Sequence, residues 1–409
     1  MSTDASDHRP VPPQEDAWTG PRPALLTLIL VAAVSPMSIN LFVPSMPSIA
    51  ADLNTNYATV QLGLSLYLIM TAVLQLLIGP LSDLYGRRPV ICGGMVLFLI
   101  GTAMCILAET TQMFLAGRVV QAASASGMVL SRAVVRDVYP REKAASAMGY
   151  MVMGMAIAPM IAPAVGGQLD VWFGWRAPFY ALGAFGAAAL IAALISLPET
   201  NRYRGIAIRS QIRNYRALAK LPAFWLYAAL SGLTSAGFFG YVGGGPAVAT
   251  EYLDLLPSAY GLYFGSCALG YSLGNFLTGR IAERRGLERM MVDGVLISLL
   301  GPALVVVFFT VGFEHPIAFF GPLSLVGFGN GMTLPNAMTA AISLKPDSAG
   351  AASGLLGATQ IGTGAIASIV AAIIVGQNPH PIPLSLFLGG CLLAGLVAAK
   401  AAIRVGEKP

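Results

Sequence analysis

Gly79-Pro-Leu-Ser-Asp83-Leu-Tyr-Gly86-Arg87-Arg88-Pro89 is a short polar stretch between two long apolar runs. Two hundred residues later, Gly279-Arg-Ile-Ala-Glu283-Arg-Arg-Gly286 again separates two apolar runs. A glycine, an acid and a glycine recur in the same register. Three matching positions carry weight because each stretch occupies the same place in its half of the chain. The pair of stretches therefore predicts two halves with the same internal order.

The composition of the whole chain points to a membrane protein. Of its 409 residues, 56% are hydrophobic and 11% are charged, against roughly 25% charged in an average soluble domain. Such a composition excludes a soluble globular enzyme, a disordered chain and a fibrous protein. The many glycines and prolines lie inside apolar runs, where neighbouring membrane helices can satisfy a broken backbone.

A bilayer core requires about 20 apolar residues per helix, and twelve segments meet this length. We expect them at 24–50, 57–80, 90–108, 112–136, 143–168, 175–197, 222–249, 258–281, 290–312, 316–342, 349–375 and 382–403. The long polar connection 198–221 divides them into two sets of six. We predict an all-α membrane protein of twelve transmembrane helices in two pseudo-symmetric six-helix bundles, an architecture of secondary transporters.

Four regions follow from these segments. Residues 1–23 are polar and proline-rich, which predicts a disordered cytoplasmic tail rather than a signal peptide. The N-terminal bundle is expected at 24–197, the cytoplasmic linker at 198–221, and the C-terminal bundle with a short tail at 222–409.

The basic residues orient this topology. With both termini in the cytoplasm, the loops after the second, fourth and eighth segments and the central linker hold most of the 24 Lys and Arg residues, and only Arg118 and Arg176 fail to reach the cytoplasmic side. The outer loops hold acids, such as Glu109 and Glu314, but nothing basic. This distribution follows the positive-inside rule, and an odd number of segments would destroy it.

Several kinds of chemistry are missing from the sequence. No Gly-Lys dipeptide exists, so there is no Walker A loop and no nucleotide-driven pump. No HExxH, channel filter or Ser/His constellation appears, and the four cysteines lie in apolar stretches without CxxC spacing. We expect no metal, no cofactor, no nucleic-acid partner and no enzymatic activity.

Arg118 lies about six residues inside the fourth segment. A charge at that depth costs several kcal/mol on insertion scales, so its side chain should face protein or water. Snorkelling to the outer interface is the alternative. Gln121 lies one turn further along a similar face.

These motifs carry a family resemblance. The stretch Gly79–Pro89 closely resembles the loop signature of the major facilitator superfamily, and Arg118-Val-Val-Gln121 resembles its fourth-segment motif. Gly154-Met-Ala-Ile-Ala-Pro159-Met-Ile-Ala-Pro163-Ala-Val-Gly166-Gly167 resembles the antiporter motif of its proton-coupled drug exporters. Together with Asn40-Leu-Phe-Val-Pro44 and Val135-Arg136-Asp137-Val-Tyr139, they resemble the Bcr/CflA branch. The resemblance implies a bacterial inner-membrane exporter of bicyclomycin and phenicols, with H+ as the coupling ion.

The resemblance also implies conformational and coupling roles. The residues concerned are Gly79, Asp83, Gly86, Arg87, Arg88, Arg118, Gln121, Arg136, Asp137, Gly154, Pro159, Pro163, Gly166 and Gly167. The loop residues would form a cytoplasmic latch; for Arg87 and Arg88 the alternative is a plain anchor at the anionic inner leaflet. The two prolines bend the fifth segment; a merely kinked packing helix is the alternative there.

Asn40 departs from the resemblance, because relatives in this branch commonly carry Asp at this position. Asn cannot titrate, so proton coupling rests on the family and has weak support from the residues. We expect the substitute proton site to be Asp83, or Arg118 with a water or substrate partner; the alternative is a uniporter without proton coupling. Asn40 is expected either to bond the substrate or to join two helices.

The substrate site is expected near the midplane between the halves. Its candidates combine aromatic rings with a few amides and suit an uncharged amphipathic compound: Asn40, Tyr67, Gln75, Phe238, Phe239, Tyr263, Tyr271, Asn275, Asn336 and Gln360. We predict a monomer in the lipid bilayer that exports small molecules by alternating access. The rivals are a metabolite uniporter or uptake carrier, a transport-dead sensor and, more distantly, a membrane-embedded enzyme.

Overall fold

The computed structural model describes residues 20–139, 147, 151, 155, 161–201, 215–345 and 349–406. Throughout these ranges the regular structure is helical, and no strand forms among them. The first half contains α1 Leu25–Asn40, the short helix η1 Val43–Ser45, α2 Met46–Asp52, α3 Tyr57–Tyr85, α4 Arg87–Ile106, α5 Thr111–Gln121, η2 Ala122–Ser124, α6 Ala125–Val138 and α8 Ala177–Ser196.

The second half repeats this helical arrangement. It contains α10 Pro222–Ala247, a single π-helical turn η3 Val248–Tyr252, α11 Pro257–Arg285, α12 Leu287–Thr310, α13 Pro316–Ser343, α14 Ala349–Gln377 and α15 Pro381–Gly406. Of the expected fifth segment, 143–168, only residues 161–168 lie in a continuously described stretch, and the helix there extends over 161–173. The expected tail 1–19 and most of the linker fall outside the described residues.

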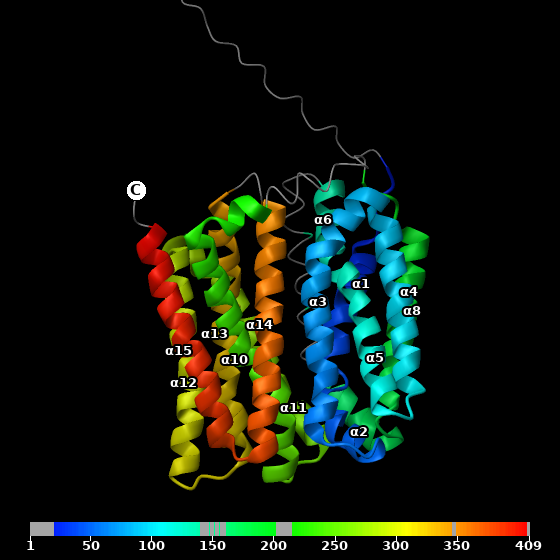
Figure 1. Cartoon of the computed structure of the whole chain (residues 1–409). Coiled ribbons are helices and arrows are strands. Elements are labelled where there is room, and N and C mark those ends of the chain that lie inside the picture. Colours follow the sequence, from blue (N-terminus) through cyan, green and yellow to red (C-terminus); the bar gives the residue numbers. More distant parts are fainter. Residues whose placement is uncertain are drawn as a thin grey trace, which may run out of the picture.

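The helices form two bundles that stand side by side, α1 to α8 in one and α10 to α15 in the other (Figure 1). Nine of the described helical segments are long and apolar enough to cross a membrane. Helices α10 and α11, with 26 and 29 residues, have the length to do so as well. The all-helical prediction is confirmed, and these segments agree with a twelve-helix protein.

The repeat seen in the sequence is present in the backbone. Helices α3 and α11 each have 29 residues and begin two hundred residues apart. Each ends at a glycine with positive φ, 105° at Gly86 and 83° at Gly286, and the next helix starts directly afterwards. Only glycine adopts such a backbone without strain, so the recurring glycines mark two equivalent turns.

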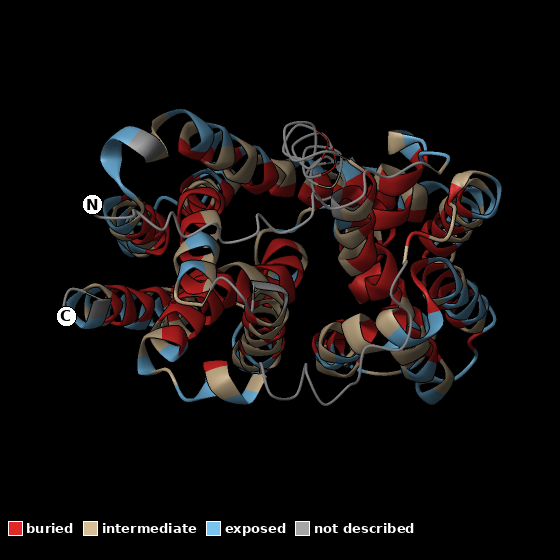
Figure 2. Ribbon diagram, turned by 90° about the horizontal axis from the view of Figure 1, so that it is seen from above, coloured by how far each residue is buried: buried red, intermediate tan, exposed pale blue. Residues whose placement is uncertain are grey.

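Apolar side chains cover the outside of the two bundles. Exposed positions lie on the perimeter and buried ones face inward (Figure 2). Among the exposed residues, Ile195 is 81% and Leu262 is 73% accessible. An apolar surface of this extent in contact with water would promote aggregation, so the perimeter fits contact with lipid.

Two of the expected helices are broken, which the sequence did not predict. The first segment changes from α1 to η1 and α2 around Pro44 and Pro47, and the fourth contains the 3-10 turn η2 between α5 and α6. Irregular backbone at membrane depth occurs where protein or a water-filled cavity surrounds it. Both breaks lie next to the site described below.

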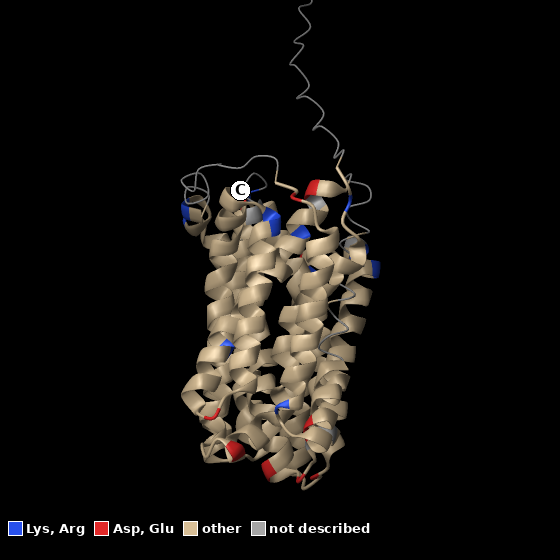
Figure 3. Ribbon diagram, turned by 90° about the vertical axis from the view of Figure 1, so that its right-hand side faces the viewer, with Lys and Arg blue, Asp and Glu red and all other residues tan. Residues whose placement is uncertain are grey.

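Charge differs between the two ends of the molecule. Basic residues gather at the end that carries the C-terminus, together with some acidic residues, and acidic residues mark the opposite end (Figure 3). Two described arginines lie far from the basic end. One is Arg176, which pairs with Asp52 at 2.9 Å, and the other is Arg118.

Candidate functional site

Arg118 is fully buried inside the N-terminal bundle. Its guanidinium donates to Ser38 O at 3.1 Å, to Ser38 Oγ at 3.2 Å and to Gln121 Oε1 at 2.5 Å. It also lies over the rings of Phe42 and Tyr67, 4.0 Å and 4.7 Å from their centroids. Arg118 therefore faces protein and does not snorkel. No carboxylate belongs to this network among the described residues, so neutral dipoles and two aromatic faces balance its charge.

Helices α1, α3, α4 and α5 and the turn η2 meet at this network. Gln121 links the network to α4, because its Nε2 donates to Thr102 Oγ1 at 2.8 Å. The Tyr67 hydroxyl is 2.8 Å from both Ser35 Oγ in α1 and Ser124 Oγ in η2. Tyr67 was predicted to line the substrate site, but in this structure it is fully buried and holds α3 against the two broken segments.

Asn40 ends α1, two residues after the Ser38 that holds Arg118. Its side chain is 3% exposed, and its Nδ2 donates to Pro36 O at 2.8 Å. Its Oδ1 is buried and has no partner in the described part of the chain. A buried acceptor without a donor is costly, which makes this atom a candidate contact for a ligand, a water or a proton-bearing group.

The loop after α3 forms a polar cluster at the basic end. Arg87 donates to Asp83 Oδ1 at 2.6 Å and to the Ser82 hydroxyl, and its Nε lies 3.4 Å from Asp137 Oδ2 in α6. The side chain thus ties α3 and α4 to the end of α6, and this location agrees with a latch. Gly79 is half-buried there. The side chain of Arg136 lies outside the described part of the chain.

Glu199, which the sequence analysis did not select, completes this cluster. Its carboxylate accepts from the backbone N–H groups of Arg87 at 2.9 Å and Arg88 at 3.3 Å, at the start of α4. A carboxylate at a helix N-terminus is favoured by the helix dipole. A side chain at Gly86 would overlap this carboxylate, so Gly86 is required by space as well as by φ. Arg88 also donates to Leu194 O at 2.8 Å.

The described part of the antiporter motif packs on both bundles. Gly166 lies against Leu41 O, at the break after α1, and a Cβ there would overlap it. Pro163 presents its carbonyl oxygen to Gly261 of α11 in the other bundle. Gly167 is buried. Gly154 and Pro159 lie outside the described residues.

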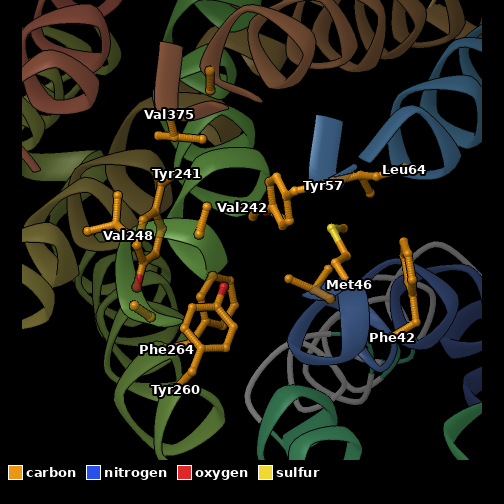
Figure 4. Packing of buried hydrophobic residues seen from close by; sticks show 14 of the residues in the cluster. Phe42, Met46, Tyr57, Leu64, Tyr241, Val242, Val248, Tyr260, Phe264 and Val375 are labelled. Carbon is orange, nitrogen blue, oxygen red and sulfur yellow. The ribbon is translucent and has the colours of Figure 1, made fainter. Parts of the chain in front are cut away.

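The bundles are joined at the acidic end by a buried seam. Tyr57 Oη donates to Gly243 O at 2.8 Å, and Gln61 Nε2 donates to Ser368 Oγ at 2.5 Å. Figure 4 shows Tyr57 and Met46 of the first bundle opposite Val242, Tyr260 and Phe264 of the second. Buried hydrogen bonds and apolar packing between the halves indicate that this end is closed.

The other substrate candidates fall into separate groups. Phe238 and Phe239 are half-buried with ring centroids 5.4 Å apart, and Tyr263 stacks on Phe320 at 5.1 Å. Gln75 and Gln360 are half-buried on the packed helices α3 and α14.

Two asparagines among the substrate candidates bond within their own helices. Asn275 Nδ2 donates to Tyr271 O at 2.8 Å, and the buried Asn336 donates to Met332 O at 2.6 Å. No single described contact joins all ten candidates, and their role in binding stays a prediction.

Arg132 is a further charged residue that the sequence analysis did not select. It lies in α6 and its side chain is exposed. The sequence signal was present, since α6 carries a basic residue six positions before its end. The positive-inside rule by itself groups Arg132 with the basic residues of the cytoplasmic side.

Comparison with known proteins identifies the family. The model of the Major Facilitator Superfamily matches residues 28–368 and 233–408. The chain belongs to this superfamily. It is therefore a multi-pass membrane transporter and not an enzyme.

Several curated relatives of this superfamily member are named for drug resistance. Multidrug resistance protein D of Escherichia coli is 30% identical over 85% of this chain and 88% of its own length. Chloramphenicol resistance protein of Pseudomonas aeruginosa is 29% identical over 76% and 73%. Bicyclomycin resistance protein homolog of Haemophilus influenzae is 27% identical over 91% and 94%. These names agree with the resemblance to the Bcr/CflA branch.

The fold also matches a solved transporter. A bacterial homolog of the human lysosomal transporter Spinster, in an inward-facing and occupied conformation, aligns with a TM-score of 0.74. The two chains are 18% identical, and the match covers 94% of this chain and 96% of the other. At that identity the match concerns the fold alone.

Proposed function

We propose that this transporter exports small amphipathic drugs of the phenicol and bicyclomycin type from the bacterial cytoplasm by proton antiport. The observation that carries the proposal is the agreement between the relatives' names and the buried Arg118 network at the two broken segments. We further propose that it acts as a monomer in the inner membrane, with both termini in the cytoplasm.

Proton coupling requires a group that titrates, and Asn40 cannot. The candidates are Asp83, whose carboxylate contacts Arg87, and a water or substrate held by the Arg118 network. The unpartnered Oδ1 of Asn40 supports a ligand-facing role for this position. Asn40→Asp introduces a carboxyl group with nearly the same shape as the amide. The variant therefore tests whether the lack of a titratable group at position 40 limits proton coupling.

Transport into everted vesicles tests the proposal. Chloramphenicol and bicyclomycin uptake is measured with and without an inside-acid pH gradient, in vesicles with equal amounts of wild-type protein, Arg118→Ala and Asn40→Asp. We expect gradient-driven accumulation by the wild type, none by Arg118→Ala and stronger gradient dependence in Asn40→Asp. Equilibration that ignores the gradient would contradict antiport and indicate a uniporter. No uptake of either compound by the wild type would contradict the drug assignment.

A further inference from the structure

Asp170 is a buried carboxylate that the Arg118 network does not use. It lies near the end of the helix 161–173 of the fifth segment, at the acidic end of the molecule, and is 8% exposed. Its Oδ2 accepts a hydrogen bond of 2.8 Å from the Ser48 hydroxyl of α2. No basic side chain in the described part of the chain forms an ion pair with it. A carboxyl group that is buried without a cation favours its neutral, protonated form.

Asp170 lies at the level of the membrane boundary. It falls two residues beyond the expected segment 143–168, and the neighbouring Trp172 and Phe173 are 65% and 74% exposed. Exposed aromatic rings gather where membrane and water meet. At this level burial raises the pKa of Asp170 above its ordinary value, and the hydrogen bond from Ser48 lowers it only in part. The carboxyl group is therefore near the solution but shielded from it by packing.

One face of the fifth segment carries Asp170 into the seam between the bundles. Pro163, Gly166 and Asp170 follow one another at spacings of three and four residues, so they share a helix face. Pro163 presents its carbonyl oxygen to Gly261 of the other bundle. Gly166 lies against Leu41 O at the break after α1. The hydrogen bond between Asp170 and α2 continues this line of contacts, so its charge acts on the face that closes the acidic end.

The charged groups nearest along the chain are engaged elsewhere. Asp52, at the end of α2, accepts from Trp175 Nε1 and from Arg176 Nη1, both at 2.9 Å. Arg176 also donates to Ile106 O at 3.1 Å and to Ala108 O at 2.9 Å. The guanidinium of Arg176 thus neutralises Asp52 and holds the end of α4, which leaves Asp170 without a cation.

The other titratable groups around this face are phenols and two histidines. Tyr57 begins α3, and Tyr260 and Tyr263 lie in α11. Phenols ordinarily ionise near pH 10, about two units above neutral conditions or more. His315 and His380 precede α13 and α15 in the second bundle, and they titrate nearer to neutral pH. Any test of Asp170 must therefore separate its effect from that of the histidines.

We propose that Asp170 is a proton-binding site that controls closure of the acidic end. With the proton bound, the neutral carboxyl packs against α2 and this end closes as in the structure. Without the proton, the carboxylate draws water into the contact and separates the fifth segment from α2. The proton comes from the solution at the acidic end and returns to it. The site therefore differs from the coupling group sought at Asn40, and the inference goes beyond the proposed function because it holds for any substrate.

Spin labels on the two bundles measure this closure. Cysteines replace the exposed Ala51 of α2 and the exposed Gln377 at the end of α14, in a variant whose four native cysteines are serine. The distance between the labels is measured by double electron–electron resonance in phosphatidylcholine nanodiscs, without drug, from about pH 5 to about pH 8.

The raised pKa of the closed state gives the sign of the expected change. Closure is fully favoured below the ordinary pKa of a carboxyl group and is lost as the pH rises through the raised pKa. A difference of one pKa unit between the two states is a tenfold change, so we expect the ratio of short to long distances to fall about tenfold over this range. A ratio that does not change with pH would overturn the proposal.

Variants assign the pH dependence to this carboxyl group. Asp170→Asn keeps the shape of the side chain but cannot titrate, so the distance should stay short throughout. Ser48→Ala removes the hydrogen bond that stabilises the carboxylate in the closed state, so closure should persist to higher pH than in the wild type. A merely structural role of Ser48 would instead loosen the contact at every pH.

Asp254→Asn is the matched control. Asp254 is exposed at the same end and has a φ of 50°, which Asn adopts readily. This variant should keep the pH dependence of the wild type. If Asp170→Asn keeps it as well, the histidines cause the effect and the proposal fails.

Infrared difference spectra between the same two pH values report the proton itself. On acidification, the wild type should gain a C=O band of a protonated carboxyl group that Asp170→Asn lacks. Identical bands in the two proteins would show that Asp170 does not bind the proton. A band that titrates while the distances stay constant would refute the control of closure. If Asp170→Asn does not fold, Ser48→Ala decides, because its shift to higher pH is expected only if Asp170 titrates.

Discussion

At the scale of single residues, two arginines of the fourth transmembrane segment lie in opposite environments. Arg118 in α5 is buried and bonded on every side, and Arg132 in α6 is exposed and unbonded within the described residues. Fourteen positions separate them, and the 3-10 turn η2 lies between. The first holds the N-terminal bundle together.

Replacing Arg118 tests how much its hydrogen bonds contribute to the stability of the folded protein. Arg118→Ala removes the donors to Ser38 O and Gln121 Oε1 and leaves these acceptors buried, so we expect the apparent unfolding temperature to fall by about 5 °C or more. Arg118→Lys keeps the charge but lacks the planar fork, and its effect should be intermediate. A thiol-reactive dye reports unfolding through the buried Cys105 and Cys267.

Arg404→Lys serves as the control for this series, because Arg404 is exposed near the end of α15. It should leave the unfolding temperature unchanged. An Arg118→Ala protein as stable as the wild type would show that the network does not contribute to folding.

Residue roles were only partly predictable from the sequence. Arg118 could be identified from the sequence, because a charged residue deep inside an apolar segment is rare and costly. Glu199 was missed because its partner, the start of α4, lies more than a hundred residues away. The burial of Tyr67 could not be predicted from the sequence, because it depends on contacts with other helices.

At the scale of elements, the seam between the bundles depends on small residues. Helix α3 packs along α14. Helix α11 contacts the fifth segment at Gly261, where the Pro163 carbonyl oxygen occupies the space that a Cβ atom would need. Helix spans were predictable because apolar length is a strong signal. The breaks after Asn40 and Gln121 were not, since those turns are stabilised by contacts with other segments.

Gly261→Val tests whether this seam closes the acidic end. The added side chain would overlap the Pro163 carbonyl, so the bundles must separate there. We expect a cysteine introduced at Ser368, which bonds Gln61 across the seam, to react faster with a membrane-impermeant maleimide from outside. The Cys92, Cys105, Cys267 and Cys391 positions are first changed to serine to remove background. Gly390→Val is the control, because a Cβ at Gly390 meets nothing within 4 Å.

An unchanged reaction rate in Gly261→Val would contradict this closure. A rate increase in Gly390→Val as well would indicate general loosening of the protein instead of a local effect at the seam.

At the scale of the whole molecule, the separation of charge sets the orientation. The net charge is +5, and its basic residues lie mainly at the end where α15 finishes (Figure 3). Basic loops are retained on the cytoplasmic side during insertion. The structure gives the shape of the two bundles, and the charge pattern predicts which end faces the cytoplasm.

Fusions at defined loops test that orientation. Green fluorescent protein after Arg404 should fluoresce, because that end is expected in the cytoplasm, and alkaline phosphatase after Glu109, Asp254 or Glu314 should be active outside. Phosphatase after Arg88 or Arg289 should be inactive. Reversing the charge bias by changing Arg87, Arg88, Arg284 and Arg285 to glutamine should lower correct insertion. Since α3 and α11 are equivalent elements of the repeat, both must cross in the same direction. Phosphatase activity after Arg289 but not after Arg88 would therefore refute the parallel repeat in the membrane.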